Sequence, residues 1–141
     1  MSSRRFLVAV SAAQLVAGIA GHVVAVRERR AFDIALLGWR GQPERVARDS
    51  LLLGTGLSAP VVMLSIQAAS TVRLATRSSR TATRVLESLG ASMTCGYLIE
   101  REFRAALSPT GWNTTATPIA TVGFALALAM ALSGLRGFVN R

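Results

Sequence analysis

The stretch FLVAVSAAQLVAGIAGHVVAV, residues 6–26, decides the fold class of this 141-residue chain. It contains no Arg, Asp or Glu, and residues 51–72 and 116–135 share this property. A soluble helix or strand interleaves apolar with polar residues at a period of 3.6 or 2, whereas these apolar residues lie in blocks. Because a helix needs roughly 20 apolar residues to cross a bilayer core, all three stretches are expected to span a membrane.

A fourth, weaker segment follows at residues 85–107. Only fifteen residues, 85–99, precede the charged sequence EREFR at 100–104. A helix of that length reaches only about 22 Å, so it spans only if residues 103–107 extend it. We favour a span because residues 85–115 would otherwise have to lie on the membrane surface, which stays open as the alternative.

The sequence therefore predicts an all-α membrane protein, a single domain over residues 1–141 with four transmembrane helices in a small bundle. The expected spans are 5–27, 50–72, 85–107 and 117–138. Between the first two, residues 31–41 (AFDIALLGWRG) are expected to form a short interfacial amphipathic segment, because Trp39 suits the headgroup level. Pro60 is expected to kink the second span.

Small residues at four-residue spacing indicate where membrane helices pack closely. The small residues of the last span predict that this helix either lies at the centre of the bundle or forms a homo-oligomer interface. Gln14 and Gln67 are expected to donate interhelical hydrogen bonds. On the first span the small residues Ala13, Ala17 and Gly21 run beside the face Gln14–Gly18–His22, and on the last span the two small-residue faces are Gly123–Ala127–Ala131–Gly134 and Ala125–Ala129–Ser133–Gly137.

All 16 basic residues are arginine, the net charge is +9, and the arginines lie in short segments between apolar blocks. This distribution is typical of charges that flank membrane spans, and it argues against a nucleic-acid partner. The 73–84 segment has no acid and is a candidate contact for anionic lipid headgroups or a partner protein; a solvated loop is the simpler alternative. Its arginines are Arg73, Arg77, Arg80 and Arg84.

Six of the seven acidic residues lie in the segments on the other side of the expected topology, at 28–49 and 100–102. Arginine numbers on the two sides are balanced, so the acids alone separate them. We therefore expect a multi-pass cell-membrane protein with both termini in the cytoplasm.

A polar site near the outer leaflet is the main candidate for function. In the expected topology His22 and Glu100 lie at the same depth, and Tyr97 continues the face of Glu100. Glu100 and Arg104 are spaced i, i+4 and are expected to form an ion pair. Ionisable residues inside a membrane are costly and often functional, so the candidate site comprises His22, Tyr97, Glu100, Arg101 and Arg104. The simpler interpretation, which we favour from the sequence, is that residues 100–104 form interfacial ion pairs that mark where a helix leaves the lipid.

Enzymatic chemistry has little support in the sequence. The single histidine cannot supply bis-histidine haem ligation within one chain, and the single cysteine, Cys95, belongs to no redox or metal motif. We expect no catalytic activity, no metal and no cofactor.

The leading functional hypothesis is a non-enzymatic subunit or interaction component of a membrane complex, which contacts the bilayer and either itself or another membrane protein. The alternative is a small homo-oligomeric transporter or lipophilic-ligand-binding protein that uses the outer polar site.

The length, the four expected spans and the nearly balanced arginines look like the small multidrug-resistance transporters, which assemble as dimers. That family relies on a membrane-embedded Glu in its first helix. Here the 5–27 segment has Gln14 and His22 and no acid. No residue role is therefore carried over from that family.

Overall fold

The computed structural model describes the backbone of residues 3–139 and the side chains of residues 3–133. The chain is mostly helical, as predicted. The four longer helices are α1 (Ser3–Arg27), α3 (Val61–Thr76), α4 (Arg80–Ile99) and α6 (Ala116–Val139). The shorter elements are β1 (Asp33–Ile34), the 3₁₀ turn η1 (Ala35–Leu37), β2 (Trp39–Arg40), the 3₁₀ turn η2 (Pro43–Arg45), α2 (Val46–Asp49) and α5 (Arg101–Ala106).

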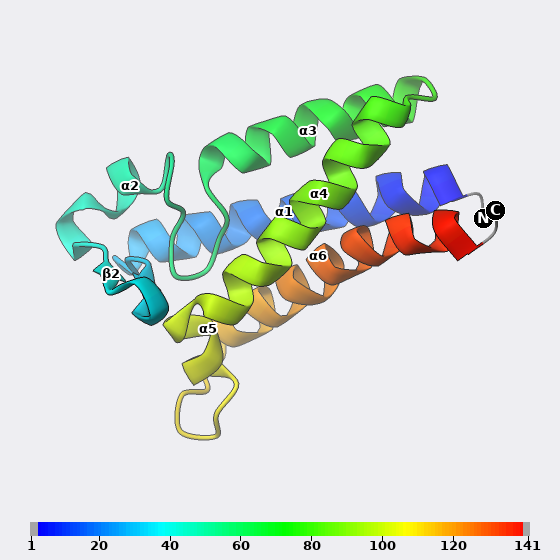
Figure 1. Ribbon diagram of the computed structural model, residues 1–141. Coiled ribbons are helices and arrows are strands. Elements are labelled where there is room, and N and C mark those ends of the chain that lie inside the picture. The colour runs from blue at the N-terminus through cyan, green and yellow to red at the C-terminus, as the bar shows by residue number, and fades with distance from the viewer. Residues whose placement is uncertain (1–2, 140–141) are drawn as a thin grey trace.

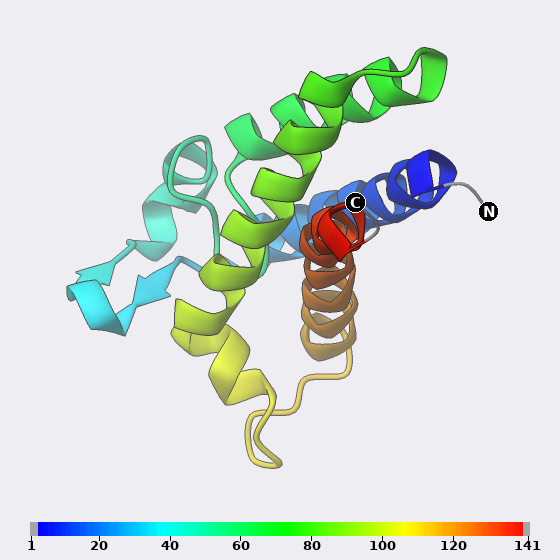
Figure 2. The same cartoon turned by 45° about the vertical axis from the view of Figure 1, so that its right-hand side comes forward.

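The four longer helices pack beside one another so that α6 contacts α1 and α4, and α3 contacts the same two helices. The start of α1, the end of α6 and the α3–α4 connection lie at one end of the molecule (Figure 1). We call this the termini end. The hairpin β1–β2, α2 and α5 lie at the opposite end, which we call the capped end, and the turned view separates the same two ends (Figure 2).

Two helices are long and apolar enough to cross a membrane, namely α1 and the Ala116–Ser133 part of α6, whereas α3 is apolar but shorter. Only 28% and 33% of their apolar windows are buried inside the chain. The core helix of a soluble protein would be mostly buried, so much of the apolar surface of both helices faces outward. Large exposed apolar residues on them include Val16, Ile19 and Val122.

The prediction of a kinked helix from residue 50 is wrong. The helix begins at Val61, and Pro60 precedes it in an extended conformation, with φ −52° and ψ 143°. Proline has no N–H and disfavours helical geometry in the residue before it, so it starts this helix instead of interrupting it. The preceding loop turns at Gly54, whose φ is +81°, and closes with a bridge between Thr55 and Ser58.

The prediction of one helix over 85–107 is also wrong. Helix α4 begins earlier, where Ser79 caps its N-terminus by accepting a hydrogen bond from the Ala82 N–H at 3.2 Å, and it ends at Ile99. Glu100 is extended, with φ −72° and ψ 124°, and α5 starts at the next residue. With 20 residues, α4 alone is about 30 Å long, so it reaches the thickness of a bilayer core without the 100–107 segment.

The 31–41 segment is a short hairpin rather than one amphipathic stretch. Asp33 pairs with Arg40 and Ile34 with Trp39 around η1. Gly38, with φ +65°, provides the left-handed residue that closes the turn. The apolar side chains at its tip, Leu36, Leu37 and Trp39, are exposed.

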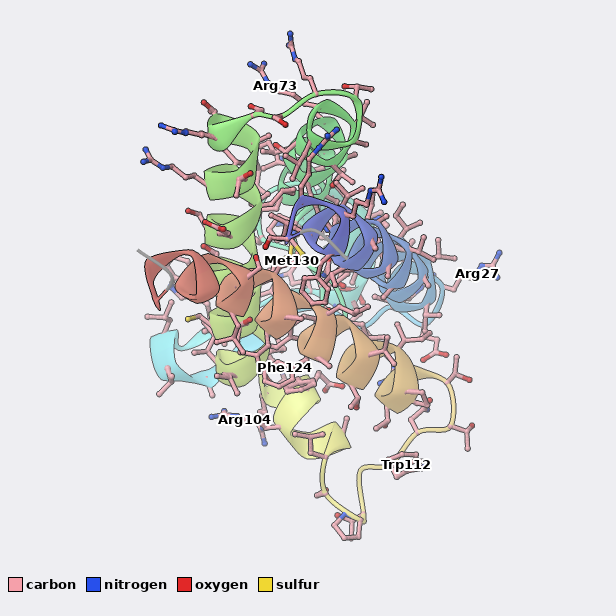
Figure 3. All side chains as sticks on the ribbon, turned by 90° about the vertical axis from the view of Figure 1, so that its right-hand side faces the viewer. Arg27, Arg73, Arg104, Trp112, Phe124 and Met130 are labelled. Atoms are coloured by element: carbon pink, nitrogen blue, oxygen red, sulfur yellow. The ribbon has the colours of Figure 1, made fainter. Side chains whose placement is uncertain are left out.

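Helices α4 and α6 approach most closely at Gly90. A Cβ atom placed on Gly90 would lie 2.6 Å from Met130 Cβ and 2.7 Å from both Ala127 O and Ala131 N. Met130 itself is fully buried, and it lies where α6 faces α1 and α4 (Figure 3). Gly123, Ala127 and Ala131 of the predicted small-residue face therefore pack inside this chain, as a central bundle position requires, whereas the packing of Gly134 lies outside the described residues.

A polar cluster lies in the middle of the helix packing. The Gln67 side-chain amide donates to Ser11 O at 2.9 Å, and the Ser11 and Thr71 hydroxyls are 2.7 Å apart. The predicted interhelical hydrogen bond of Gln67 is therefore confirmed. Gln14 is fully buried, but neither polar atom of its side chain has a partner among the described residues, so its predicted bond is absent.

The α4–α6 contact predicts a contrast between two glycines of the same helix. Gly90→Ala places a methyl group against backbone atoms of α6 that cannot rotate away, and we expect it to lower the stability by about 1–3 kcal/mol. Gly96→Ala is the matched control, because nothing lies within 4 Å of its Cβ position and alanine favours a helix. Thermal unfolding in detergent measures both. Equal stability of the two variants would contradict the close contact at Gly90.

Candidate functional site

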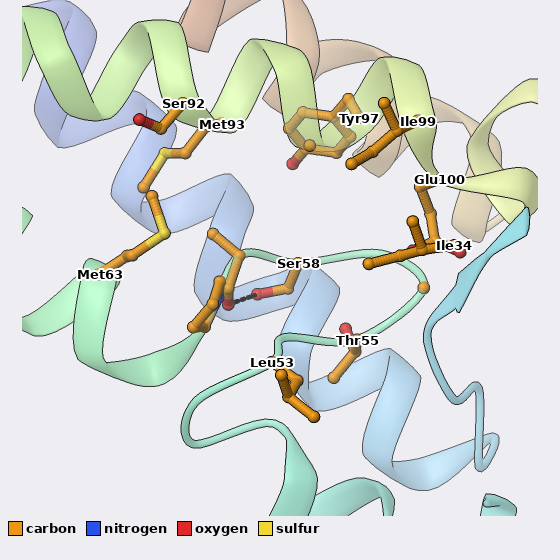
Figure 4. A pocket seen from close by; sticks show the side chains of 14 residues that line it. Ile34, Leu53, Thr55, Ser58, Met63, Ser92, Met93, Tyr97, Ile99 and Glu100 are labelled. Carbon is orange, nitrogen blue, oxygen red and sulfur yellow. Dashed lines mark hydrogen bonds between the residues drawn. The ribbon is translucent and has the colours of Figure 1, made fainter. Parts of the chain in front are cut away.

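A cavity of about 100 Å³ lies between α3, α4, the 51–60 loop and the start of the hairpin (Figure 4). Its lining is mainly apolar, with a few hydroxyl groups and one carboxyl. It is lined by Ile34, Leu53, Thr55, Gly56, Ser58, Ala59, Pro60, Met63, Ser92, Met93, Gly96, Tyr97, Ile99 and Glu100.

The cavity exists because α3 starts late and α4 has a gap in its side chains. The nonhelical 51–60 loop fills the place that a continuous second helix would occupy, and its Leu57 carbonyl packs onto Gly21 of α1. On α4, Gly96 presents no side chain to this space. Met63 and Met93 face the cavity from opposite helices, and their flexible side chains adapt to irregular contents (Figure 4).

Glu100 is the charged residue of the cavity, and it is only 7% exposed. Its Oε1 accepts a hydrogen bond from the Asp33 backbone N–H at 2.8 Å, which joins the end of α4 to the hairpin. Burial raises the pKa of this carboxyl from 4.5 to about 7, although the backbone N–H groups of Asp33 and Glu102 favour the ionised form. Glu100 follows the last residue of α4 and is therefore held at the junction between two helices.

The acidic neighbours of Glu100, unlike Glu100 itself, are paired with arginine. Among the residues whose side chains are described, Arg30 pairs with Glu28 at 2.6 Å and with Glu102 at 3.6 Å. Asp33 is 3.6 Å from Arg40 and 3.7 Å from Arg101. None of these ion pairs includes Glu100, whose carboxyl is held by the backbone N–H groups of Asp33 and Glu102 and has no cationic partner.

Tyr97 connects the cavity to the core of the molecule. Its ring packs against Phe103 at 5.2 Å and Phe124 at 6.1 Å between centroids. A Cβ on Gly123 would meet the Tyr97 Oη at 2.5 Å, so the small residue on α6 makes room for the phenol. This packing positions α5 and α6 against the end of α4 and forms one side of the cavity wall.

The structure brings together two of the five residues predicted for the outer polar site. Tyr97 and Glu100 line the cavity, whereas His22, Arg101 and Arg104 do not. His22 is half-buried on α1, and its Nδ1 has no partner in the described part of the chain. Arg101 pairs with Asp33 instead.

The predicted Glu100–Arg104 ion pair is wrong. The helix breaks at Glu100, so the i, i+4 spacing no longer places the two side chains one above the other. Arg104 is exposed and points outward from α5 (Figure 3). Only the Arg104 backbone N–H bonds to Glu100, through its carbonyl at 3.3 Å.

The four arginines of the 73–84 segment lie at the termini end and are exposed. Arg73 marks this end in Figure 3 and donates to the Ser79 hydroxyl at 3.2 Å. The Arg4 guanidinium donates to Leu74 O and Ala75 O, both at 2.7 Å, which fastens the start of α1 to this segment. No acid forms an ion pair with these arginines among the described side chains.

Several cavity residues were missed by sequence reasoning, among them Thr55, Ser58, Met63 and Gly96. The glycines and proline of GTGLSAP, residues 54–60, are the signal that could have identified a loop inside the expected second span. Within the described residues, no group of three or more His, Cys, Asp or Glu side chains is placed to hold a metal.

No protein-family model matches this chain, and comparisons with curated proteins and with solved structures give no match. The chemistry of the site therefore follows from its own geometry: a small apolar cavity with hydroxyl groups and one buried carboxyl fits a small ligand that combines an apolar body with a hydrogen-bond donor or a cation.

The buried carboxyl predicts a pH-dependent stability. Because the pKa of Glu100 is raised in the folded chain, the stabilisation by its protonated form is complete below about pH 4.5 and is lost as the pH rises to about 7. We expect thermal stability in detergent to fall over this range by no more than about 3 kcal/mol, and Glu100→Gln to remove this part of the fall.

Glu44→Gln is the matched control, since this acid is exposed and does not act on Glu100. It should leave the slope between pH 4.5 and 7 intact. An unchanged slope in Glu100→Gln would contradict the burial of an unpaired carboxyl.

Proposed function

We propose that the protein is a multi-pass membrane protein in which α1, α3, α4 and α6 cross the bilayer. Four observations support this proposal. Two of the helices are long and apolar enough to span, α4 reaches about 30 Å, and exposed apolar residues such as Val62, Ile66 and Leu98 also lie on α3 and α4. Trp39 and Trp112 are both exposed at the capped end, as expected of residues at a membrane–water interface.

Helix α3 is the short member of this set, with 16 residues or about 24 Å. The 51–60 loop completes its crossing in the proposal. Nonhelical backbone at membrane depth is tolerated where it is buried in protein, and Gly54 to Ser58 are all buried. The loop also satisfies its own backbone, since Thr55 N–H donates to Ser58 O and Val61 N–H to Ser50 O.

In the proposed orientation the protein lies in the cell membrane, and its termini end faces the cytoplasm. That end carries Arg73, Arg77, Arg80 and Arg84 without an acid partner among the described ion pairs, and anionic headgroups are the partner that such a surface attracts. At the capped end the arginines of the ion pairs are compensated by acids.

Reporter fusions test this orientation. A reporter after residue 40 or 111 should be found outside, and one after residue 79 or 141 inside, because α1, α3, α4 and α6 alternate in direction. A reporter at residue 111 found inside would show that α4 does not cross the membrane. If all four reporters lie on the opposite side from the one expected, the proposed orientation is reversed.

Within this architecture, we propose that the protein binds a small amphiphilic ligand in the cavity at the capped end. The observation that carries the proposal is the buried Glu100 carboxyl, which borders an apolar cavity and has no arginine partner among the described residues. A buried carboxyl that has backbone N–H partners but no cation favours a ligand with an amine, because the ammonium group would neutralise its charge.

The second candidate is a non-enzymatic subunit or interaction component of a membrane complex, which was the leading hypothesis from the sequence. It is favoured by the other small-residue face of α6, where Ala125 is exposed and Ala129 and Ser133 are half-buried. The face of α6 that contains Gly123 already packs against α4 within this chain, at Gly90 and Tyr97. The second face is therefore the one available to a helix of another protein.

Butylamine and butanol distinguish the two functions, since a cavity of about 100 Å³ holds a chain of this size. At pH 8, where Glu100 is ionised, butylamine should raise the thermal stability of the purified chain more than butanol does. Gly96→Leu fills the cavity without meeting any atom within 4 Å of its Cβ, and it should abolish the butylamine effect.

Ala91→Leu is the control for that variant, because Ala91 is an exposed residue on the same helix. It should leave the butylamine effect unchanged. A chain that ignores butylamine and purifies with a stoichiometric larger partner in mild detergent would instead favour the subunit function.

A further inference from the structure

A second hollow, separate from the cavity, opens at the capped end between the end of α1, the hairpin and α5. It has a volume of about 550 Å³, and we call it the outer cleft. Strand β1 stands between the two spaces, since Asp33 lines the outer cleft and Ile34 lines the cavity. The charged residues of the outer cleft are Glu28, Arg29, Arg30, Asp33, Arg40 and Glu102.

The outer cleft has equal numbers of positive and negative side chains, but its arginines differ in how closely they are paired with acids. Arg30 is occupied by Glu28 at 2.6 Å and Glu102 at 3.6 Å, and it is only 24% exposed. Arg40 is loosely paired with Asp33 at 3.6 Å and is 78% exposed. Arg29 forms no ion pair or side-chain hydrogen bond among the described residues, so it is the cation that is free to bind a ligand.

Arg29 is held in a backbone conformation that favours glycine. Its φ is +53°, the only positive value among the described non-glycine residues. Helix α1 ends here with the Arg30 N–H bonded to Ala25 O at 2.8 Å and the Arg29 N–H to Val26 O at 3.3 Å, a helix ending in which glycine is the usual left-handed residue. The left-handed conformation is unfavourable for a residue with a Cβ atom, so an arginine at this position beside a cleft indicates a function for its side chain.

We propose that the outer cleft binds the phosphodiester of a zwitterionic headgroup, with Arg29 and Arg40 on the phosphate and Glu28 and Glu102 toward the ammonium group. Guanidinium groups match phosphate oxygens in bidentate fashion, and Arg29 and Arg40 are the two arginines of the cleft with the most freedom to do so. A cleft with three positive and three negative side chains has no net attraction for a bare anion, whereas a zwitterion matches both signs.

The proposal stands apart from the cavity function, because its residues and its ligand chemistry are different. It also does not require the membrane orientation proposed above, since soluble headgroups can be tested on the purified chain. Two soluble probes, a zwitterionic phosphodiester and a bare phosphate, test whether the cleft uses both signs of its charge.

Titration calorimetry in an uncharged detergent compares glycerophosphoethanolamine with inorganic phosphate. The full chain should bind glycerophosphoethanolamine more tightly than phosphate, because only the zwitterion matches both signs of charge in the cleft; equal or tighter binding of phosphate would overturn the proposal. Arg29→Gly should weaken binding at least about tenfold and yet raise the unfolding temperature, because glycine removes the backbone strain. A residue with only a structural role would not give these opposite changes.

Arg40→Gln is the second variant, placed on an exposed strand residue, and it should weaken binding in the same direction. Arg48→Gln is the matched control, because this exposed arginine lies at the same end but outside the cleft, and its binding should equal that of the unmodified chain. The proposal is overturned if neither probe binds, or if Arg29→Gly binds as tightly as the unmodified chain.

Discussion

The close contact between α4 and α6 at Gly90 is the constraint on which the rest of the structure depends. It leaves no room for a side chain, so it fixes both the separation and the register of the two helices. Two turns further along α4, this register places Tyr97 against Gly123 and Phe124. Two residues after Tyr97, α4 ends at Ile99, and α5 turns so that Phe103 joins the same aromatic cluster. The aromatic cluster at the break is therefore built on the same α4–α6 packing as the Gly90 contact.

The arginines at the two ends of the molecule have different kinds of partner. At the capped end, Arg30, Arg40 and Arg101 link the end of α1, the hairpin and α5 through three acids. Exposed ion pairs of this kind contribute little individually, but together they orient segments with little regular structure. At the termini end, the Arg4 guanidinium instead bonds to backbone carbonyls at the end of α3, and the arginines of the 73–84 segment form no ion pair among the described side chains. The difference in charge pairing between the two ends therefore arises from the positions of the acidic residues, as their distribution in the sequence indicated.

The apolar blocks and the spacing of small residues predicted the helical character, the α1 and α6 segments and the internal packing of Gly123 and Ala127 correctly. What they missed depends on contacts between distant residues. The start of α3 could have been read from Pro60 and the glycines before it, because those residues act locally. The end of α4 could not, because Ile99 and Glu100 carry no stop signal, and the break is stabilised by the Asp33 N–H and by Phe103 packing. The same break separated Glu100 from Arg104 and so changed the composition of the predicted site.

The position of Glu100 is best understood from the arginines that do not pair with it. Arg101 is its neighbour in sequence, and Arg30 and Arg40 bond to acids of the same end, yet all three pair with Glu28, Asp33 or Glu102. A carboxyl kept only for stability would be expected to take one of these cations, since burial without a partner is costly. Instead, one oxygen of Glu100 holds the hairpin through the Asp33 N–H, while the carboxyl borders the cavity. The residue thus joins the cap to the cavity wall, so that any group bound beside Glu100 would also act on the hairpin that covers it.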